Sequence, residues 1–523
     1  MPDKRLSELI SAIPGGILGS MGEGDPVIQR IMLDSREVGE GDLFVALVGG
    51  NVDGHRYINP AVDQGACAVM GTRSMEEFST IGVPYFQVEN ARLALAYISA
   101  ALYDFPARKL TVIGITGTDG KTTTCNLLYH ILLNAGIKVG MISTVNAVIG
   151  DRVLDTGFHV TTPEAPDVQR YLSMMVDAGL THVILESTSH GLAQYRVAGC
   201  EYDMGVVTNI THEHLDYHKT YEAYRESKAR LFTSLSETVE KPLGNLRLAV
   251  LNKDDVSFSY LDEVTRTRKV AYSLHPQADI WAEDIQYSPA GLLFTARGID
   301  FSAPVHCTLL GEYNVSNILA AMAAAIFGLG ISPHIAADGI SRLPGVPGRM
   351  ERIDMGQDFL AIIDFAHTPN ALLQALESAR KMTRGRVLAV FGSAGLRDRQ
   401  KRRMMAEVSI EHADLTYLTA EDPRTESLDD ILAEMADAAQ FKGGVEGKTF
   451  HRVPDRGGAI CAAINEAQPG DLVISCGKGH EQSMCFGVEE YDWDDRTAMR
   501  AALATRLQIP GPEMPYLPTS VAK

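Results

Sequence analysis

The chain alternates between short apolar runs and longer amphipathic stretches. Between residues 110 and 136, the run LTVIGI leads into a glycine-rich turn and then into TTTCNLLYHILLNAG, which ends at a glycine. A short β-branched run bounded by turn residues is typical of a buried strand, and apolar positions that recur every three to four residues are typical of a helix. This region is therefore predicted to be a strand, a glycine loop and a helix.

The same rhythm continues downstream of this region. The strand-like runs VGMIST, THVILE and YDMGVVTNI are separated by helical segments such as PDVQRYLSMMVDAG. Alternation of strands and helices favours a doubly wound, mostly parallel sheet. We therefore expect an α/β fold for the central part of the chain.

Two further blocks repeat the pattern on either side. DLFVAL, ACAVMG and PYFQVE alternate with helical segments such as YINPAVDQG before the central block, and DFLAIID, RVLAVFG, ADLTYLT and DLVISCG follow LPGVPGRMERID. Prolines and glycines in this last segment break regular structure. We predict three α/β domains, at residues 1–107, 108–345 and 346–523, and an irregular proline-rich end, IPGPEMPYLPTSVAK.

Composition limits the classes of function. With 523 residues, 45% hydrophobic and 22% charged, the chain has the composition of a folded multidomain protein. The formal net charge of −19 argues against nonspecific binding to nucleic acid or anionic membranes. No apolar run approaches the ~20 residues of a membrane helix, and MPDKRLSELI lacks a signal-peptide core, so we expect a cytoplasmic protein without membrane insertion.

The cysteines and the rest of the sequence give little indication of cross-links, metal sites or assembly. Seven cysteines are scattered without a C-x-x-C pair, which favours neither a disulfide framework nor a zinc site. The sequence holds no signal for oligomerisation, so a monomer is the working expectation.

The glycine turn has the chemistry of a phosphate-binding loop. Its candidate residues are Gly117, Thr118, Asp119, Gly120, Lys121, Thr122 and Thr123. The standard G-x-x-x-x-G-K-[ST] pattern is incomplete, since Ile115 occupies the place of the first glycine. Backbone N–H groups at the start of the helix can still surround a phosphate, with Lys121 neutralising it and the Thr122 hydroxyl binding Mg²⁺. We predict that the loop binds the phosphates of a nucleotide.

A second cluster points to what is done with the nucleotide. Glu186 follows the apolar run HVIL, at the strand end where α/β sheets present ligands, and His214 lies in TNITHEHLDYH at another strand end. A carboxylate, an imidazole and the threonine hydroxyl can together hold a divalent metal. The alternatives are that the histidine-rich segment is polar surface and that Lys228, in YRESKARLF, is a surface lysine.

An ordered set of motifs resembles the Mur ligases, most closely the MurE type, the UDP-N-acetylmuramoyl-tripeptide synthetases. In sequence order these motifs are GTDGKTTT, ESTSHGL, TNITHEHLDYHKTYEAYRESKARLF, GEYNVSNILAA, GRMERI, DFAHTPNAL, RDRQKRRMM, EDPR and GKGHE. They cover the chain from about Asp34 to about Arg496, and the family's GT[DN]GKT loop accounts for the missing first glycine.

The resemblance implies an ATP-dependent amide ligase of cytoplasmic peptidoglycan synthesis. Such an enzyme phosphorylates the free D-glutamate carboxylate of UDP-N-acetylmuramoyl-L-alanyl-D-glutamate, and an incoming amine displaces phosphate from the acyl phosphate. In this interpretation Lys121 contacts the β/γ-phosphates, Thr122 binds one Mg²⁺, and Glu186 with His214 binds a second. Lys228 matches the family lysine that is carbamylated, which turns a cation into an anion able to help hold that metal.

The resemblance also assigns the substrate-binding residues. Around the muramoyl dipeptide it places Thr161, Thr162, Thr188, Gln194 and Arg196, with threonine instead of the more usual serine at 188. The uridine face is assigned to Asp34-Ser35-Arg36 and to DGH at 53–55, hence to Ser35, Arg36 and His55. Nucleotide contacts from outside the loop are assigned to Asn314, Asn317, Arg349, Asp364 and His367, with a purely structural role left open for Asn317 and His367.

The choice of amino acid depends on the EDPR stretch. Arg397, Gly477 and Glu481 match the residues that grip the common end of the incoming amino acid, and enzymes that add meso-diaminopimelate usually have DNPR where this chain has Glu421-Asp422-Pro423-Arg424. A guanidinium at Arg424 can pair with the distal carboxylate of diaminopimelate, which lysine and ornithine lack. Asp422 in place of asparagine favours a lone ammonium instead, or an internal pair with Arg424. Diaminopimelate is the leading prediction, and lysine or ornithine the alternative.

Other departures and functions stay open at this point. Asp119 replaces the commoner asparagine, Glu213 stands where aspartate usually precedes His214, and GSAGLRD replaces GCGGDRD around Arg397. A folylpolyglutamate synthetase-like ligase would share the loop and metal cluster, although the DSR, DGH, TTPE and GKGHE motifs argue against it. A noncatalytic ATP-binding scaffold is the alternative from a different class of function.

Overall fold

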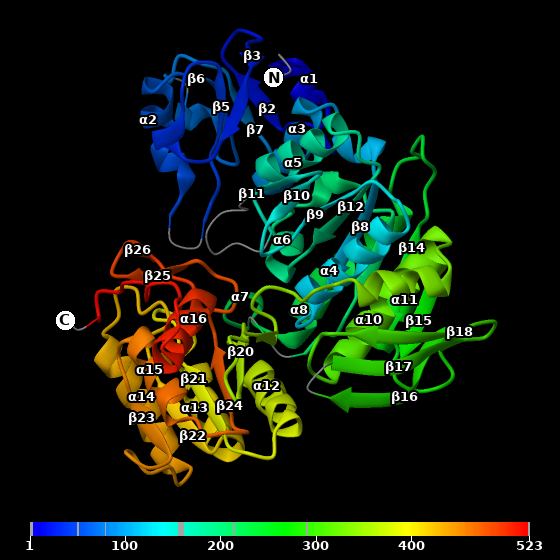
Figure 1. Cartoon of the computed structure of the whole chain (residues 1–523). Coiled ribbons are helices and arrows are strands. Elements are labelled where there is room, and N and C mark those ends of the chain that lie inside the picture. Colours follow the sequence, from blue (N-terminus) through cyan, green and yellow to red (C-terminus); the bar gives the residue numbers. More distant parts are fainter. Residues whose placement is uncertain are drawn as a thin grey trace. The chain divides into compact units, whose positions relative to one another are not determined.

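The structure, a computed structural model, describes residues 4–49, 52–78, 80–154, 162–211, 213, 215–288 and 291–520 (Figure 1). The chain forms two compact units. Unit 1 contains Met1–Tyr272 and Ala323–Ile331, and unit 2 contains Ser273–Met322 and Ser332–Lys523. This division follows neither of the boundaries near residues 107 and 345, which therefore stay predictions.

The N-terminal part of unit 1 is built on a five-stranded sheet in the order β2-β7-β6-β5-β4. Its strands β4 to β7 are parallel, and β2 runs antiparallel to β7. The strands are β2 (Gly19–Met21), β4 (Arg30–Met32), β5 (Asp42–Val45), β6 (Ala66–Gly71) and β7 (Tyr85–Gln87), and β1 (Lys4–Arg5) pairs with β3 (Val27–Ile28). The helices are α1 (Leu6–Ser11), η1 (Ser35–Glu37), η2 (Gly54–Tyr57), α2 (Ile58–Asp63), η3 (Met75–Phe78), α3 (Ala91–Leu102) and η4 (Pro106–Lys109). The strands predicted at DLFVAL, ACAVMG and PYFQVE are confirmed.

The central sheet of unit 1 is mostly parallel, as predicted. Its strands follow the order β11-β10-β9-β12-β8-β13-β14-β15, in which the antiparallel hairpin of β10 and β11 forms one edge. They are β8 (Thr111–Thr116), β9 (Val139–Ile142), β10 (Ala147–Ile149), β11 (Arg152–Leu154), β12 (His182–Glu186), β13 (Met204–Val207), β14 (Leu248–Asn252) and β15 (Arg268–Ser273). Since β8 lies between β12 and β13, the loops after these three parallel strands meet at one sheet edge.

Helices cover the central sheet and its core. They are α4 (Lys121–Asn134), α5 (Ala165–Asp177), α6 (Ser189–Ala193), η5 (Ala198–Cys200), α7 (Leu215–His218), α8 (Tyr221–Thr233), η6 (Ser234–Ser236), α9 (Phe258–Val264) and η7 (Ala324–Gly328). Fully buried residues of α5, α8 and the strands, among them Leu172, Leu231 and Val183, form one continuous core. Burial on both faces explains why these strands are uninterrupted apolar runs.

Unit 2 begins with an antiparallel meander that the sequence pattern did not single out. It consists of β16 (Ile280–Ser288), β17 (Gly291–Gly298) and β18 (Ser302–Cys307), followed by α10 (Tyr313–Ala323) and α11 (Pro333–Ser341). Along β18, exposed and buried residues alternate strictly. This two-residue period is the signature of a sheet with one face toward solvent.

The C-terminal part of unit 2 contains a sheet in the order β19-β20-β24-β21-β22-β23. Its strands are β19 (Glu351–Arg352), β20 (Leu360–Asp364), β21 (Val387–Phe391), β22 (Leu415–Leu418), β23 (Phe450–Arg452) and β24 (Leu472–Cys476), and β25 (Ser483–Phe486) pairs with β26 (Glu489–Asp492). The helices are α12 (Pro369–Met382), α13 (Arg399–His412), α14 (Leu428–Phe441), α15 (Arg456–Glu466) and α16 (Asp495–Leu507). The four strands predicted here are confirmed.

Alternation along these strands divides the apolar residues between two cores. Ile362 and Ala389 pack with α12, α13 and α14, whereas the neighbouring Ile363 and Leu388 pack with α15 and α16. Because successive side chains of a strand point to opposite faces, the sheet lies between two layers of helices.

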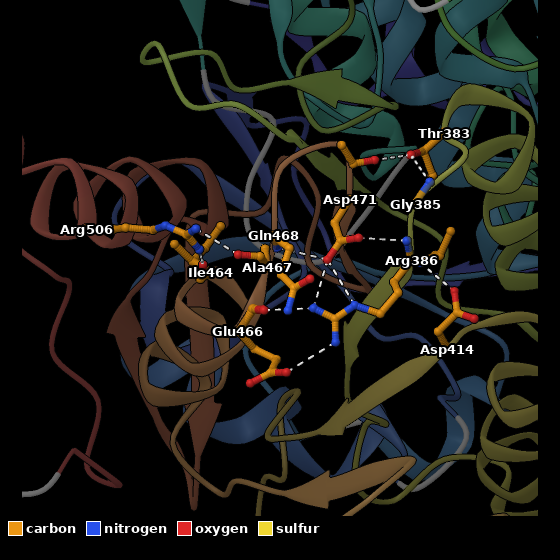
Figure 2. A network of polar contacts seen from close by, with 12 residues as sticks. Thr383, Gly385, Arg386, Asp414, Ile464, Glu466, Ala467, Gln468, Asp471 and Arg506 are labelled. Carbon is orange, nitrogen blue, oxygen red and sulfur yellow. Dashed lines mark hydrogen bonds and ion pairs between the residues drawn. The ribbon is translucent and has the colours of Figure 1, made fainter.

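A polar network fixes the end of this sheet where β21 and β24 begin (Figure 2). The Arg386 guanidinium donates to Asp471 at 2.9 and 3.1 Å and to Glu466 at 3.2 Å, and Asp471 also accepts from the backbone N–H of Gln468. The N–H of Val387 donates to Asp414 at 2.7 Å. These contacts satisfy polar groups at the amino ends of the strands. The candidate site residues lie at the opposite, carboxyl ends, where α/β sheets bind ligands.

The C-terminal segment is irregular, as predicted, but it is packed. Leu517 is fully buried in the core beside α15 and α16, and Thr519 and Ser520 donate to Asp455, the residue that caps α15. Among the helices in the described ranges, none has the length and apolar character needed to cross a membrane.

Candidate active site

The phosphate loop lies between β8 and α4, and its two glycines have steric reasons to be there. Gly120 has a φ of +82°, and a Cβ on Gly117 would lie 1.8 Å from the Thr208 hydroxyl oxygen. The left-handed region at Gly120 favours glycine, and no side chain fits at Gly117. The loop can therefore approach the end of β13 closely, with the first N–H groups of α4 directed out of the helix.

Two residues after β13 hold the loop in shape. The Asn209 carbonyl oxygen accepts from Thr118 N–H at 2.7 Å, and its side-chain oxygen accepts from Asp119 N–H at 3.0 Å. The Thr208 hydroxyl donates to the Asp119 carbonyl oxygen at 2.6 Å. Neither residue was a sequence prediction, although TNI at a predicted strand end was the available signal.

Glu186 lies directly against the phosphate loop. Both of its carboxylate oxygens accept from the Thr122 hydroxyl at 3.1 Å, and they also accept from the Thr144 N–H at 3.0 Å and the Thr144 hydroxyl at 2.9 Å. Glu186 is 1% exposed, and its β12 position pairs with Ile115 of β8. The strand-end argument therefore placed this carboxylate correctly, while Thr144 was missed because β9 was not known to be the neighbouring strand.

Lys228 is a buried residue rather than a surface lysine. Its ammonium is fully buried on α8, donates to the Gly117 carbonyl oxygen at 2.6 Å and lies 4.7 Å from the centre of the Tyr224 ring. Burial lowers the pKa of this ammonium well below its usual value, and the positive charge of Lys121 lowers it further. Lys121 itself folds back to donate to the Thr118 carbonyl oxygen at 2.7 Å.

His214 and Thr161, two of the predicted site residues, lie outside the described residues. Within the described ranges, no group of three or more histidine, cysteine, aspartate or glutamate side chains is gathered as a metal site. The metal set predicted at Thr122, Glu186, His214 and Lys228 is therefore represented by three of its members, of which Thr122 and Glu186 are in contact.

Four residues predicted for the muramoyl substrate form one connected cluster next to Glu186. The Thr162 hydroxyl donates to the Glu186 carbonyl oxygen at 3.1 Å and lies 3.0 Å from the Thr188 hydroxyl. Arg196 donates to the Thr162 carbonyl oxygen at 2.8 Å and to the Gln194 side-chain oxygen at 2.7 and 3.0 Å. Thr188 also caps α6 by accepting from Gly191 N–H. These contacts place a guanidinium and two hydroxyls beside the candidate catalytic carboxylate.

The predicted uridine face lies at the carboxyl ends of β4 and β5. Ser35 is buried, whereas the Arg36 side chain is 86% exposed and pairs with Asp34 at 2.5 Å. His55 is buried, with Nδ1 2.7 Å from Asp53 and Nε2 accepting from Thr72 N–H at 3.0 Å. Because both ring nitrogens contact protein groups, the His55 ring is held in a fixed position at this face.

In unit 2, the residues predicted to contact nucleotide fall into two groups. Asn314 donates to the Leu310 carbonyl oxygen at 2.6 Å and accepts from Asn317 at 2.9 Å, so both asparagines have local structural contacts. Around Phe365, at the end of β20, the Arg349 guanidinium lies 4.5 Å from the ring centre and the His367 ring lies at the same distance. Burial lowers the pKa of His367 well below its usual value, and Lys401 contributes to the decrease.

Asp364 organises the beginning of that second group. Its carboxylate accepts from the Met350 N–H at 2.7 Å and the Ala366 N–H at 2.8 Å. The Asp364 carbonyl oxygen accepts from Gly477 N–H at 3.1 Å. The nucleotide-side residues of this unit are thereby linked to the predicted amino-acid pocket.

Loops after β21, β22 and β24 converge on the EDPR segment. Gly395 N–H donates to the Asp422 carbonyl oxygen at 3.0 Å, and Arg424 N–H donates to the Cys485 carbonyl oxygen at 3.1 Å. Arg397 is exposed on the first of these loops. Asp422 and Arg424 both have positive φ, of 40° and 53°, which is uncommon for residues other than glycine and is often found at ligand sites.

The charges of this pocket are distributed differently from the internal pair considered for Asp422 and Arg424. Asp422 pairs with Lys478, whose Nζ lies 3.1 and 3.2 Å from its two oxygens, and Lys478 also pairs with Glu481 at 2.5 Å. The Arg424 guanidinium makes no hydrogen bond or ion pair with any described residue. Lys478 was missed because a lysine between glycines, in GKGHE, has the pattern of a surface residue.

Glu421, the first residue of the EDPR stretch, has unusual surroundings in the structure. It is buried, Oε2 has no hydrogen-bond partner among the described residues, and a Cβ on Gly477 would lie 2.2 Å from that oxygen. Burial raises the pKa of Glu421 to about 7, partly offset by the positive charges of Arg456, Lys401 and Lys478.

Comparisons with known proteins agree with this geometry. Family models match residues 27–103 (Mur ligase family, catalytic domain), 115–325 (Mur ligase middle domain) and 348–479 (Mur ligase, glutamate ligase domain). The UDP-N-acetylmuramyl-tripeptide synthetase of Roseiflexus sp. is 42% identical over 92% of this chain and 95% of its own length. The UDP-N-acetylmuramoyl-L-alanyl-D-glutamate--2,6-diaminopimelate ligase of Geobacillus thermodenitrificans is 38% identical over 96% of this chain and 100% of its own.

A solved structure agrees as well. A UDP-N-acetylmuramoyl-L-alanyl-D-glutamate--2,6-diaminopimelate ligase has a TM-score of 0.62 and 30% identity, covering 92% of this chain and 96% of its own. Three family models in order along the chain, together with full-length relatives and a phosphate loop in contact with Glu186, lead to one conclusion. This chain belongs to the Mur ligase family, has the three-domain architecture of that family, and is of the MurE type.

Proposed function

We propose that this protein is an ATP-dependent amide ligase that joins meso-diaminopimelate to UDP-N-acetylmuramoyl-L-alanyl-D-glutamate in peptidoglycan precursor synthesis. The observation that carries the ligase chemistry is the contact between the Glu186 carboxylate and Thr122 of the phosphate loop. It brings an anion for metal binding to the place where the nucleotide phosphates bind. Cytoplasmic location and a monomeric state belong to the same proposal.

The reaction takes place in two steps. A free carboxylate oxygen of the D-glutamate attacks the γ-phosphorus of ATP, the bond between that phosphorus and the bridging oxygen breaks, and ADP leaves. The amine nitrogen of the amino acid then attacks the acyl carbon, the carbon–oxygen bond to phosphate breaks, inorganic phosphate leaves and the nitrogen loses a proton. Phosphorylation is needed because a carboxylate is a poor electrophile without a leaving group.

Residues of unit 1 bind the phosphates and the metal in this proposal. The backbone N–H groups of the loop and Lys121 bind the β/γ-phosphates, which offsets negative charge where two anions must meet. Oxygen atoms of Glu186, Thr122 and Thr144 are gathered at the start of α4, a donor set that suits Mg²⁺. When bound, Mg²⁺ neutralises charge on the phosphate oxygens. His214 and Lys228 complete the proposed ligand set.

Carbamylation of Lys228 is supported by its surroundings. The neutral amine, not the ammonium, attacks CO₂ to form the carbamate with release of a proton. Burial lowers the pKa of Lys228 and thereby favours the neutral amine. The resulting anion would lie close to Gly117, on the same side of the loop as its present hydrogen bond.

Substrate positions follow the clusters already described. Thr162, Thr188, Gln194 and Arg196 bind the peptide end of the muramoyl substrate next to Glu186, and Thr161 completes this set; Ser35, Arg36 and His55 form the uridine face. On unit 2, Asn314, Arg349, Asp364 and His367 bind nucleotide, and Arg397, Gly477 and Glu481 bind the common end of the amino acid.

The preference for diaminopimelate is supported by the unpaired guanidinium of Arg424. The objection from Asp422 is weakened because Asp422 pairs with Lys478, which it shares with Glu481, and not with Arg424. A distal carboxylate can then pair with Arg424, whereas lysine and ornithine offer only a second cation. Lysine or ornithine stays the alternative substrate.

The direct test is a ligation assay with defined substrates. The protein is incubated with ATP, Mg²⁺, UDP-N-acetylmuramoyl-L-alanyl-D-glutamate and one amino acid at a time, and product mass and released phosphate are measured. We expect a product with meso-diaminopimelate, in excess over lysine and ornithine. If none of the three amino acids gives phosphate release and product, the ligase proposal is contradicted. A higher rate with lysine would contradict only the preference.

A further inference from the structure

Lys478 is a buried lysine held between two carboxylates of the amino-acid pocket. Its side chain is 0% exposed, and its Nζ lies 3.1 Å from Asp422 Oδ1 and 2.5 Å from Glu481 Oε2. Asp422 is fixed from another direction as well, because its Oδ1 accepts from Cys485 N–H at 3.0 Å. A lysine without partners is costly to bury, so this ammonium and the two carboxylates stabilise one another.

The pairing changes the charge that the pocket offers to a ligand. Asp422 and Glu481 carry two negative charges, and Lys478 and Arg424 carry two positive ones, so the four sum to zero. Lys478 is committed to the two carboxylates, whereas the Arg424 guanidinium has no ion pair with any described residue. The group therefore presents a centre of Lys478 and two carboxylates with a net charge of −1, and one unpaired cation that brings the total to zero.

The neighbouring groups do not overturn this balance. Arg456, which faces Glu421, is paired with Asp495 at 2.6 Å in a fully buried contact. Glu421 itself is buried without a hydrogen-bond partner at Oε2 among the described residues, a position that favours the protonated, uncharged form. Arg397, assigned above to the common end of the amino acid, and Lys401, which acts on Glu421, add positive charge that is the same in every variant, so differences between variants depend on the four charges above.

We propose that Lys478 is a positioning residue that sets the amino-acid preference of the pocket. By offsetting one of the two carboxylate charges and holding Asp422 and Glu481 in place, it leaves Arg424 as the group that selects a ligand. A diamino acid whose far end carries both a carboxylate and an ammonium suits a pocket of zero net charge. An amino acid with only an ammonium at its far end suits a pocket with one negative charge in excess. This inference depends on the ligase function proposed above.

The chain offers a matched set of charge variants. Lys478→Gln makes the group of four negative by one charge, Asp422→Asn makes it positive by one, and the double variant returns it to zero. Lys442→Gln is the control for loss of a lysine charge elsewhere, because Lys442 forms an exposed Lys–Glu pair with Glu411 at 2.6 Å outside the pocket. For each protein, kcat and KM are measured with meso-diaminopimelate and with lysine, at saturating ATP and UDP-muramoyl dipeptide.

The expected quantity is the ratio of kcat/KM for diaminopimelate to kcat/KM for lysine. Lys478→Gln lowers this ratio about tenfold, mainly through KM, and Asp422→Asn raises it, since a unit charge at close range in a partly buried site changes affinity by about that factor. The double variant and Lys442→Gln return values near that of the wild type. A ratio that is equal in all five proteins would overturn the proposal.

Two further measurements separate the possible causes of failure. Thermal unfolding shows whether Lys478→Gln folds. If it does not, Asp422→Asn, expected to raise the ratio, and the double variant, expected to return it to the wild-type value, still decide the question. Binding of each amino acid, followed by the shift in melting temperature, does not require turnover. If the wild type ligates no amino acid, the ligase proposal fails, and an unchanged binding preference across the variants overturns the role of Lys478 independently.

Discussion

The phosphate-loop site of unit 1 and the proposed amino-acid pocket of unit 2 differ in how their polar groups are satisfied. Around the loop, candidate catalytic groups contact one another or the loop backbone: Glu186 binds Thr122 and Thr144, and Lys228 binds Gly117. In the pocket, the buried Glu421 Oε2 has no hydrogen-bond partner among the described residues, and the half-buried Arg424 guanidinium forms no ion pair with them.

This difference separates two kinds of requirement. Groups that act on every turnover at a shared reaction centre are held in place before any ligand arrives, which lowers the cost of ordering them. Groups that discriminate between ligands keep bonding capacity that only the correct ligand satisfies, since a buried polar group left unpaired opposes the wrong one. The predictions below test this contrast, beginning with the largest expected effect.

Replacement of Lys228 tests the preassembled site most severely. Lys228→Ala is expected to lower kcat at least ~10³-fold, because a charged group at the reaction centre is removed. If the lysine acts as a carbamate, short carboxylates such as acetate or formate restore part of the activity. The measurement is phosphate release at increasing carboxylate concentration.

The control for this variant is Lys241→Met. Lys241 is another buried lysine, paired with Asp203 at 2.6 Å, and its loss is expected to lower stability without any rescue by carboxylates. Full activity of Lys228→Ala would remove the residue from the mechanism. Equal rescue of both variants would show that the carboxylate effect is not specific.

Gly117→Ala tests whether the close approach of the loop is needed. A Cβ at this position would lie 1.8 Å from the Thr208 hydroxyl, so the loop must shift, and we expect ATP affinity to fall about 100-fold as phosphate contacts are lost. Gly136→Ala, after the same helix, is the control. Gly136 also has positive φ, but a Cβ added there would have no described atom within 4 Å, so only stability should fall, by about 1 kcal/mol.

Nucleotide binding by both variants can be followed by titration with ADP. Unchanged affinity in Gly117→Ala would mean that the contact with Thr208 does not position the loop. A decrease of the same size in Gly136→Ala would mean that general destabilisation explains the effect.

Arg424→Ala tests the role of the unpaired guanidinium in the proposed amino-acid pocket. We expect kcat/KM for diaminopimelate to fall about 10- to 100-fold, through loss of a charge-assisted pair, while lysine is unaffected. The φ of +53° affects alanine and arginine similarly, so the backbone cost is matched. Arg452→Ala removes an arginine paired with Glu446 outside the pocket, and it should leave kcat/KM unchanged for both amino acids. Equal losses for both amino acids in Arg424→Ala would contradict a selective role.

Glu421→Gln is expected to act mainly on stability. The folded-state pKa of Glu421 is raised to about 7 from 4.5, so the folded protein retains a proton that the unfolded chain has lost. Stability from this group is therefore full below about pH 4.5 and decreases up to about pH 7. Relative to the wild type, Glu421→Gln should gain stability over this window, by roughly 3 kcal/mol at most.

Urea unfolding between pH 4 and pH 8 measures this trend. Glu426→Gln is the matched control with the opposite sign, because hydrogen bonds from Arg402 lower the pKa of Glu426, so this carboxylate contributes stability that is lost at acid pH. A difference between Glu421→Gln and wild type that is constant with pH would contradict the buried, protonated state.

The sequence predicted the parts of this fold that depend on local pattern. Strand runs such as LTVIGI and DLVISCG, and the helix after Gly120, follow from hydrophobic period and glycine position, and Glu186 was placed at a strand end on the same grounds. The contacts of Thr144 and Asn209 were not predictable in this way, since they depend on which strands become neighbours. The meander of β16 to β18 was missed although its alternation is local, because the prediction followed the uninterrupted apolar runs of buried strands.

The pocket in unit 2 shows the limit of motif comparison more sharply. Asp422 was recognised as a departure from the usual asparagine, but its effect on specificity depended on a partner 56 residues away, Lys478. The burial of Glu421 was equally invisible, because it lies against Gly477, in the loop after a strand distant in sequence. In the proposal above, long-range charge pairing decides the specificity that the local motif left open.

The central claim is that the site beside Lys121 and Glu186 converts an inert carboxylate into an acyl phosphate. It is tested most directly with UDP-muramoyl dipeptide labelled with ¹⁸O in the D-glutamate carboxylates, followed by mass analysis of the released phosphate. The account predicts one ¹⁸O atom in the phosphate for each amide bond formed, because the attacking carboxylate oxygen leaves with phosphorus. Unlabelled phosphate released together with ligated product would contradict it.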